Sequence, residues 1–207
     1  MKGLLLKDWL VVVKQTKIYF VLMAAFALVP GMGIYSIFFG ALLPVTAFAY
    51  DERSKWNQMA DMMPYSSREM VIGKYVFGYM AVGGVVLLEL LIWALYNISG
   101  VSQAGGAENM FVILVSVVSA LTVMALDIPV MFFMGVEKSR IVLMFVTIFV
   151  MLGIQSAFSP AVFGETVFMP PEWNFFMSLG LLLAAGAVQL ASITVSSKLY
   201  QAKTGKR

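Results

Sequence analysis

Long apolar runs separated by short polar segments dominate the chain. A helix needs about 20 apolar residues to cross a hydrocarbon core of about 30 Å. Four runs meet this requirement, and we expect them to form the membrane helices 67–98, 109–134, 140–158 and 174–197. The earlier run, 18–50, is too long for one ordinary span, and a turn signal at Pro30 and Gly31 lies near its middle. The pattern therefore predicts a helical hairpin at 18–50 and six membrane spans in all.

The positions of the basic residues test this count. With six spans, the predicted cytoplasmic segments carry all 14 Lys and Arg residues, and the predicted outer loops carry none. The outer segments carry acidic residues instead, namely Glu108, Glu165 and Glu172. Because positive charge gathers in cytoplasmic loops, we expect both termini to lie inside the cell. The same distribution explains the net charge of +3 by topology and by attraction to anionic lipid, so no nucleic-acid partner is expected.

Composition agrees with a membrane protein. Of the 207 residues, 61% are hydrophobic and 12% are charged, and the mean hydropathy is +0.90, whereas about 25% of the residues of a soluble domain are charged. We therefore expect one all-helical, polytopic membrane domain over 1–207, with a basic tail at 198–207. Cysteine and histidine are absent, so thiolate nucleophiles, imidazole bases and the usual zinc or haem ligands are absent too. Among the possible functions, an intramembrane enzyme is the least supported.

The segment 51–66 is the predicted cytoplasmic loop between spans two and three. Its apolar residues recur at helical spacing, at Trp56, Met59, Ala60 and Met63. Polar residues fill the positions between them, which predicts an amphipathic helix of about three turns over 52–63. Ser66 and Glu69 then have the spacing of a capping box, which would start the next membrane helix. An amphipathic helix of this kind either rests on lipid headgroups or docks into a groove of another protein.

The residues before the first span, 1–17, also have two faces. Lys7, Asp8, Lys14 and Gln15 lie on one face of a helix, and Leu6, Trp9, Leu10 and Val13 lie on another. This pattern predicts an interfacial helix on the inner leaflet, with anchoring as its simplest role.

Three parts of the chain resemble one protein family. Glu52, Arg53 and Trp56, followed by the string MPYSSREMVIGKY at 63–75, look like the loop after span two of small ABC-2 type transporter permeases. The strings LKDW at 6–9 and PVMFFMGVEKSR at 129–140 resemble the N-terminal helix and an inner turn of the same family. Met63 replaces the usual leucine, and the serine pair before Arg68 has one serine more than the common pattern. The resemblance covers almost the whole chain and does not specify a substrate.

The resemblance implies half of a bacterial exporter similar to type V ABC exporters. In such systems two six-span permeases, identical or different, pair in the cell membrane, and each binds a cytoplasmic ATPase. The loop helix at 52–63 would then be the coupling helix, with these ATPase-docking residues: Glu52, Arg53, Trp56, Met59, Ala60 and Met63. The chain has no phosphate-binding G-x-x-x-x-G-K-[ST] loop. ATP and Mg²⁺ are therefore expected in the partner subunit, and no cofactor or metal is expected in this chain.

Two acidic residues lie inside predicted spans, Glu89 and Asp127. Carboxylates in a bilayer usually face the bundle interior or water, so both are candidates for lining a transport path. Glu89 could instead be hydrogen-bonded in the core, and Asp127 could satisfy the backbone that Pro129 opens two residues later. If both acids bind ions or protons, the chain would be an ATP-independent channel or secondary carrier.

The predicted outer loop 159–173 mixes apolar residues with three prolines. Such a segment is typical of a short external gate near the outer leaflet, for which Phe163, Glu165 and Phe168 are the candidate residues. The alternative is an ordinary interfacial loop anchored by Trp173. If the exporter interpretation holds, peptides, antimicrobial compounds or hydrophobic molecules are the expected kinds of substrate.

Overall fold

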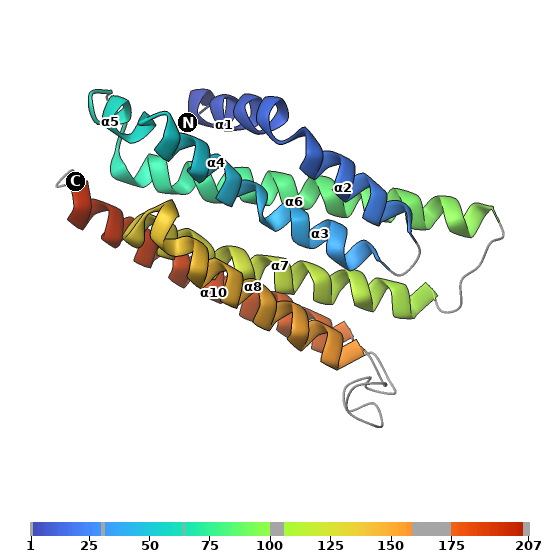
Figure 1. The fold of residues 1–207 in the computed structure, drawn as a ribbon. Coiled ribbons are helices and arrows are strands. Elements are labelled where there is room, and N and C mark those ends of the chain that lie inside the picture. Colours follow the sequence, from blue (N-terminus) through green and yellow to red (C-terminus); the bar gives the residue numbers. More distant parts are fainter. Residues whose placement is uncertain (1, 30–31, 64, 100–105, 159–174, 205–207) are drawn as a thin grey trace.

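A computed structural model describes residues 2–29, 32–63, 65–99, 106–158 and 175–204, and every regular element in these ranges is a helix (Figure 1). The helices are α1 (Lys2–Gln15), α2 (Lys17–Leu28), α3 (Gly33–Ala41), α4 (Leu43–Arg53), α5 (Trp56–Asp61), α6 (Ser67–Ile98), α7 (Gly106–Met134), α8 (Val136–Phe158) and α10 (Phe175–Thr204). The candidate gate residues Phe163, Glu165 and Phe168 lie outside the described residues.

The helices form an elongated bundle in which both termini and α5 lie at the same end (Figure 1). The turn between α7 and α8 lies there too, because the backbone N–H of Val136 donates to a carboxylate oxygen of Glu52 at the end of α4. We call this end of the bundle the terminal end. Arg53 and Lys55, which come just before α5 in the sequence, are exposed.

Within the described residues, four segments are long and apolar enough to cross a membrane. They are Gly33–Arg53, Ser67–Ile98, Ile113–Met134 and Ser178–Ala202. A fifth arises if α1 and α2 count as one span, although they are bent by 79° at their junction. Alone, α2 has 12 residues, a length of about 18 Å. The structure thus supports a multi-pass membrane protein, and the count of six spans stays a prediction.

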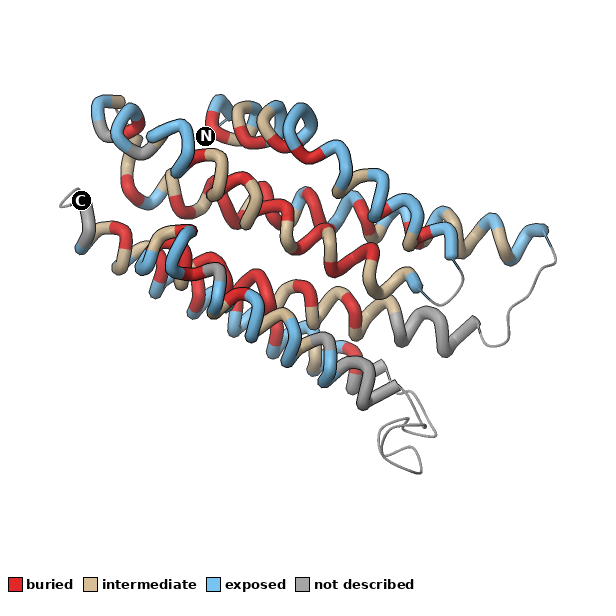
Figure 2. The backbone as a smooth tube through the Cα atoms, viewed as in Figure 1, coloured by how far each residue is buried: buried red, intermediate tan, exposed pale blue. Residues whose placement is uncertain are grey.

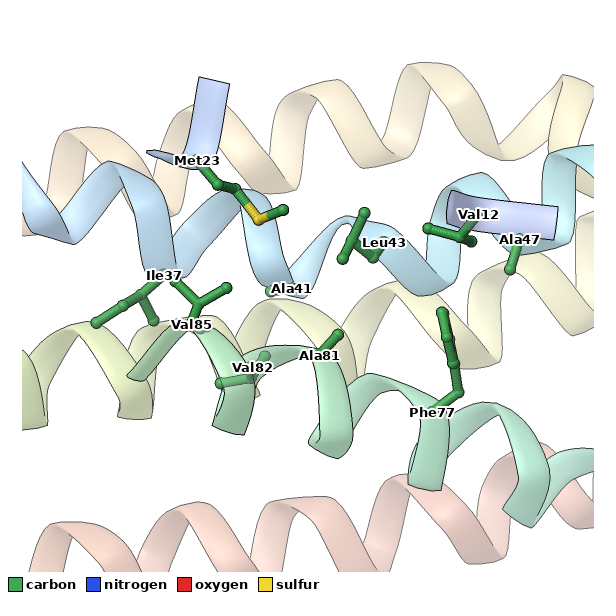
Figure 3. Close-up of a cluster of buried hydrophobic side chains, with 11 residues drawn as sticks. Val12, Met23, Ile37, Ala41, Leu43, Ala47, Phe77, Ala81, Val82 and Val85 are labelled. Carbon is green, nitrogen blue, oxygen red and sulfur yellow. The ribbon is translucent and has the colours of Figure 1, made fainter. Parts of the chain in front are cut away.

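Two apolar clusters hold the bundle together. The first joins α1, α2, α3, α4, α6 and α7, and Figure 3 shows its side chains meeting between these helices, among them Met23, Ile37, Leu43 and Phe77. The second lies nearer the terminal end and includes Phe48, Val71 and Phe132.

The outer sides of α8 and α10, by contrast, carry many exposed residues, as Figure 2 shows. Large apolar side chains such as Phe149 and Leu190 are exposed there, as expected of surfaces that face lipid or another membrane subunit.

Local signals set several helix ends. Ser66 and Glu69 form the predicted capping box at the start of α6, with the Ser66 hydroxyl accepting from the Glu69 N–H and the Glu69 carboxylate accepting from the Ser66 N–H. This prediction is confirmed. At the α7–α8 turn, Gly135 has a φ of +76°, a conformation that costs glycine little and other residues more.

The predicted extent of the loop helix was wrong. The loop helix expected over 52–63 is interrupted, because α4 continues to Arg53 and Lys55 adopts a left-handed φ of 54° before α5 begins. Helix α5 itself has only six residues. The physical reason is tertiary: Asp51 and Glu52 are held by other helices, so they stay with α4 while the chain turns after them. At the other terminus, α10 continues to Thr204, so much of the predicted tail 198–207 is helical.

Candidate functional site

Four charged side chains are packed together at the terminal end, and we call them the charge cluster: Lys7, Asp8, Asp51 and Lys74. The Lys74 ammonium lies 2.9 Å from Oδ1 of Asp8 and 2.6 Å from Oδ2 of Asp51. The Lys7 ammonium lies 2.5 Å from Oδ1 of Asp51 and 2.9 Å from Oδ1 of Asp8. Two cations and two anions therefore alternate in a closed, electrically balanced ring that joins α1, α4 and α6.

The charge cluster is largely removed from water. Asp8, Asp51 and Lys74 are buried. Burying an ion is costly unless it is paired and hydrogen-bonded, and here each of these three side chains has charged partners within hydrogen-bonding distance. The apolar surroundings are also suitable, since the Lys74 ammonium lies 5.0 Å from the centre of the Phe48 ring. The cluster thus fixes three helices relative to one another at this end.

Helix α5 is attached to the charge cluster through Trp56. The Lys7 ammonium lies 4.5 Å from the centre of the Trp56 ring, a cation–π contact. The Trp56 Nε1 is buried and has no hydrogen-bond partner among the described residues. Ala60, one turn later, is 4% exposed. One side of α5 therefore packs against the protein through Trp56 and Ala60.

Other side chains of α5 and of the residue after it are exposed. Met59 is 52% exposed and Met62, just after the helix, is 88% exposed. Gln58 is exposed on the same short segment, and Arg53 and Lys55 are exposed just before it. An apolar surface with basic neighbours is thus displayed at the terminal end.

The six predicted docking residues differ in how exposed they are. Met59 and Arg53 are exposed, Ala60 is buried, and Trp56 and Met63 are half-buried. Glu52 is an exposed residue whose carboxylate nevertheless accepts from the Val136 N–H at 2.7 Å. It thereby occupies the N-terminus of α8, where a negative charge is favoured. Glu52 thus links α4 to the α7–α8 turn.

The intramembrane acid Glu89 lies against the start of α3. A Cβ placed on Gly33 would lie 2.5 Å from its Oε2 atom, so the absence of a side chain at Gly33 lets the carboxylate approach the helix end. Its Oε1 atom is buried without a hydrogen-bond partner among the described residues. Glu89 therefore lies close against the start of α3 with one carboxylate oxygen left unsatisfied among the described residues.

Asp127 has a different environment. It is 1% exposed, and both carboxylate oxygens lack a hydrogen-bond partner among the described residues. Pro129 lies inside α7 and cannot supply the N–H that the carbonyl of Ala125 would otherwise accept. The hydroxyl of Ser192 on α10 donates to that carbonyl at 2.5 Å. The predicted alternative role of Asp127, satisfying the backbone opened by the proline, is thus filled by Ser192 at this carbonyl.

A chain of hydroxyl groups extends from this point to α6. Tyr75 Oη lies 2.5 Å from Ser192 Oγ and 2.9 Å from Ser196 Oγ. Because Ser192 gives its single proton to Ala125, Tyr75 donates to Ser192 and Ser196 donates to Tyr75. Two turns of α10 are therefore bound to both α6 and α7.

Gln189 extends the same contact one turn further. Its amide donates to the Leu121 carbonyl at 2.6 Å and accepts from Tyr79 at 3.0 Å. We call Tyr75, Tyr79, Gln189, Ser192 and Ser196 the hydroxyl–amide seam. The seam holds α10 against the carbonyls of Leu121 and Ala125 in α7, just before Pro129.

Sequence reasoning did not single out the charge cluster as a unit or identify the hydroxyl–amide seam. Lys7 and Asp8 were placed only on the polar face of the N-terminal helix, Lys74 was only part of a family-like string, and Asp51 was only the first residue of the predicted loop 51–66. The available signal was that Asp8 and Lys74 fall among apolar residues on their helices. Their separation by 66 positions concealed the pairing.

Comparison with known proteins decides the family. A family model described as ABC-2 family transporter protein matches residues 3–201. The chain belongs to this family. No curated protein and no solved structure matches it. The ABC-2 match includes the charge cluster, α5, both intramembrane acids and the seam, so all of these are parts of an ABC-2 family chain.

Membership of the ABC-2 family gives the coarse function. The chain is a permease component of an ABC transporter, a multi-pass membrane part that is not itself the catalytic component. Permeases of this family usually work with an ATPase subunit.

Proposed function

We propose that the protein is the membrane-spanning subunit of an ATP-driven exporter, and that a separate cytoplasmic ATPase docks on α5. ATP and Mg²⁺ are held by that ATPase, and this chain carries the substrate path together with a second permease, identical or different. The observation that supports docking is the exposure of Met59 on α5 and of Met62 just after it, at the terminal end. Methionine packs adaptably against partner surfaces, which suits a helix that must follow a moving subunit.

The proposed topology has six spans, both termini in the cytoplasm, and a bacterial cell membrane as its location. Support comes from the position of α5 at the same end of the bundle as both termini (Figure 1), because the sequences of α1, α10 and the segment before α5 all contain lysine or arginine. Because the chain has no cysteine, single cysteines can be placed at will. Ser99→Cys, at the far end of α6, should react with an impermeant maleimide in intact cells. Ser54→Cys should react only after permeabilisation, and the reverse result would overturn the topology.

The docking experiment compares two double variants. Met59→Ala with Met62→Ala removes the exposed apolar side chains next to α5, whereas Met80→Ala with Met144→Ala removes two similarly exposed methionines from α6 and α8. The ATPase is co-purified with the permease in mild detergent and its affinity is measured. Loss of two interface anchors should weaken binding about thirtyfold. The matched control should bind normally.

Either of two results would contradict the docking proposal. The first is that the Met59 and Met62 variant retains the ATPase with unchanged affinity. The second is that both double variants lose it equally, which would indicate a general defect of the membrane bundle. The partner is identified by mass spectrometry of the material that co-purifies with the parent chain.

The free oxygens of Asp127 and Glu89 support a second candidate, an ATP-independent channel or secondary carrier. Such a protein would use the buried acids to bind protons or cations. It would retain transport in vesicles without ATP and lose transport when an ionophore collapses the proton gradient. The exporter would show the opposite dependence. Peptides, antimicrobial compounds and hydrophobic molecules are the first substrates to test in both assays.

A further inference from the structure

The charge cluster is an unusual way to join helices. A buried ion-pair network is often no more stabilising than apolar side chains of similar volume. What it does supply is defined geometry, because each ammonium must stay within hydrogen-bonding distance of its carboxylates. Here Lys74 of α6 is bonded to Asp8 of α1 and to Asp51 of α4. A displacement of any one of these three helices must therefore move the others or break a buried ion pair.

Helix α5 is joined to this network by a side chain as well as by the backbone. The backbone between α4 and α5 turns sharply at Lys55, which makes it a poor transmitter of force along a straight line. Trp56, by contrast, packs against Lys7, and Lys7 is bonded to Asp51. A continuous set of contacts thus leads from α5 through Lys7 to Lys74.

We propose that Lys74 is the positioning residue through which movement of α5 reaches α6 and the N-terminal helix α1. This inference rests on the proposed function, since it assumes an ATPase that moves α5. It adds a second part to the coupling apparatus: α1 moves with α5 and α6 instead of serving only as a membrane anchor. The exposed apolar face of α1, with Leu6, Trp9 and Leu10, would transmit that movement to the lipid surface.

A balanced double variant separates this role from simple charge neutralisation. Lys74→Met together with Asp8→Asn removes one cation and one anion, and it leaves Lys7 paired with Asp51. If the charge cluster only balances charge, this variant should behave like the parent. If Lys74 positions the helices, the variant should fold and bind the ATPase but respond poorly to it. The control is Lys14→Met, which removes an exposed lysine from the same N-terminal helix.

The experiment uses the full permease–ATPase complex in lipid nanodiscs, with ATP as the probe. Three quantities are measured: ATPase affinity, stimulation of ATP hydrolysis by the permease, and the distance between spin labels on Gln15→Cys and Gln58→Cys. We expect the balanced variant to keep its ATPase affinity and to lose about tenfold in stimulation, a size typical of coupling between sites. The label distance should also become broadly distributed. Lys14→Met should leave all three quantities unchanged.

A second variant protects the test against a folding defect. Trp56→Leu leaves all four ion pairs in place and removes only the contact between α5 and Lys7. It should also reduce stimulation, without broadening the distance between labels on α1 and α6 at Gln15→Cys and Met80→Cys. Full stimulation in Trp56→Leu would overturn the proposed path, and so would full stimulation in the balanced variant.

The two proposals fail in different ways. If the parent chain binds no ATPase, the proposed function fails. If the ATPase binds and the Met59 and Met62 variant releases it, but the balanced Lys74 variant is stimulated normally with a narrow label distance, only the positioning role fails.

Discussion

The carboxylates of the charge cluster and the two intramembrane carboxylates differ in how many partners they have. At the terminal end, Asp8 and Asp51 share two lysines and have several hydrogen-bond partners. Deeper in the bundle, Asp127 has no partner for either oxygen among the described residues, and Glu89 has one free oxygen. A carboxylate with a full set of partners is suited to fixing helices. A carboxylate without them is available for a proton, water or a passing cation.

The largest effect should come from Asp51→Asn. This change leaves the buried Lys74 and the partly buried Lys7 with one anion, Asp8, between them. Removing one partner of a buried ion pair typically costs about 3–5 kcal/mol. The free energy of unfolding can be measured by tryptophan fluorescence of the detergent-solubilised permease during denaturation. If the free energy of unfolding fell no more than it does when an exposed residue is substituted, water would already be screening the charges of the cluster.

Ser192→Ala should have the next largest effect. It removes the donor to the Ala125 carbonyl and also deprives Tyr75 of an acceptor. Leaving buried polar groups unsatisfied should reduce the free energy of unfolding by about 1–2 kcal/mol. Ser197→Ala is the matched control, because the Ser197 hydroxyl donates to the Ile193 carbonyl of its own helix. If Ser192→Ala lost no more free energy of unfolding than Ser197→Ala, the Ala125 carbonyl would have found another donor.

Glu89→Gln should have a smaller effect on stability. The substitution keeps the shape of the side chain and removes a negative charge that lies against the N-terminus of α3. Interactions of this kind are worth about 0.3–1 kcal/mol. The same unfolding measurement tests the value, and a loss as large as that of Asp51→Asn would place Glu89 with the fully paired acids.

The smallest effect should come from Asp127→Asn. It is the same chemical change as Asp51→Asn, yet it breaks no hydrogen bond among the described residues. Because no hydrogen bond is lost, the free energy of unfolding should change by less than about 0.5 kcal/mol, the lower end of what one hydrogen bond contributes. A transport assay on the same variant then has a clear meaning, because any loss of transport cannot come from loss of stability. A large destabilisation would mean that Asp127 has a bonding partner, and Asp127 would then not differ from Asp51 in this respect.

Signals that act over a few residues were predictable from the sequence. The capping box at Ser66 and Glu69 needs only a spacing of three, and the helices on either side of Pro30 and Gly31 are expected from apolar runs and a turn signal. The apolar stripe of the loop helix was visible as well. Its periodicity could not show which side would face the protein, because that depends on Lys7 lying beside Trp56.

Contacts between distant residues were beyond such signals. Lys74 meets Asp8 across 66 positions and Asp51 across 23. Ser192 reaches Ala125 across 67 positions. None of these pairs shares a helix, so no helical period connects them. Pro129 indicated an unsatisfied carbonyl, and the sequence offered Asp127 as a local partner, but the packing of α10 supplied a hydroxyl instead.

The bond between Ser192 and Ala125 also bears on how the protein is made. During synthesis α7 leaves the ribosome before α10, and a carbonyl without a donor is costly inside a bilayer. Until α10 is inserted, the Ala125 carbonyl of α7 therefore lacks its donor and must accept a hydrogen bond from water or from another transient partner. Insertion of α10 brings the Ser192 hydroxyl to this carbonyl. A helix that is synthesised late thus satisfies the backbone hydrogen bonding of one that is synthesised earlier.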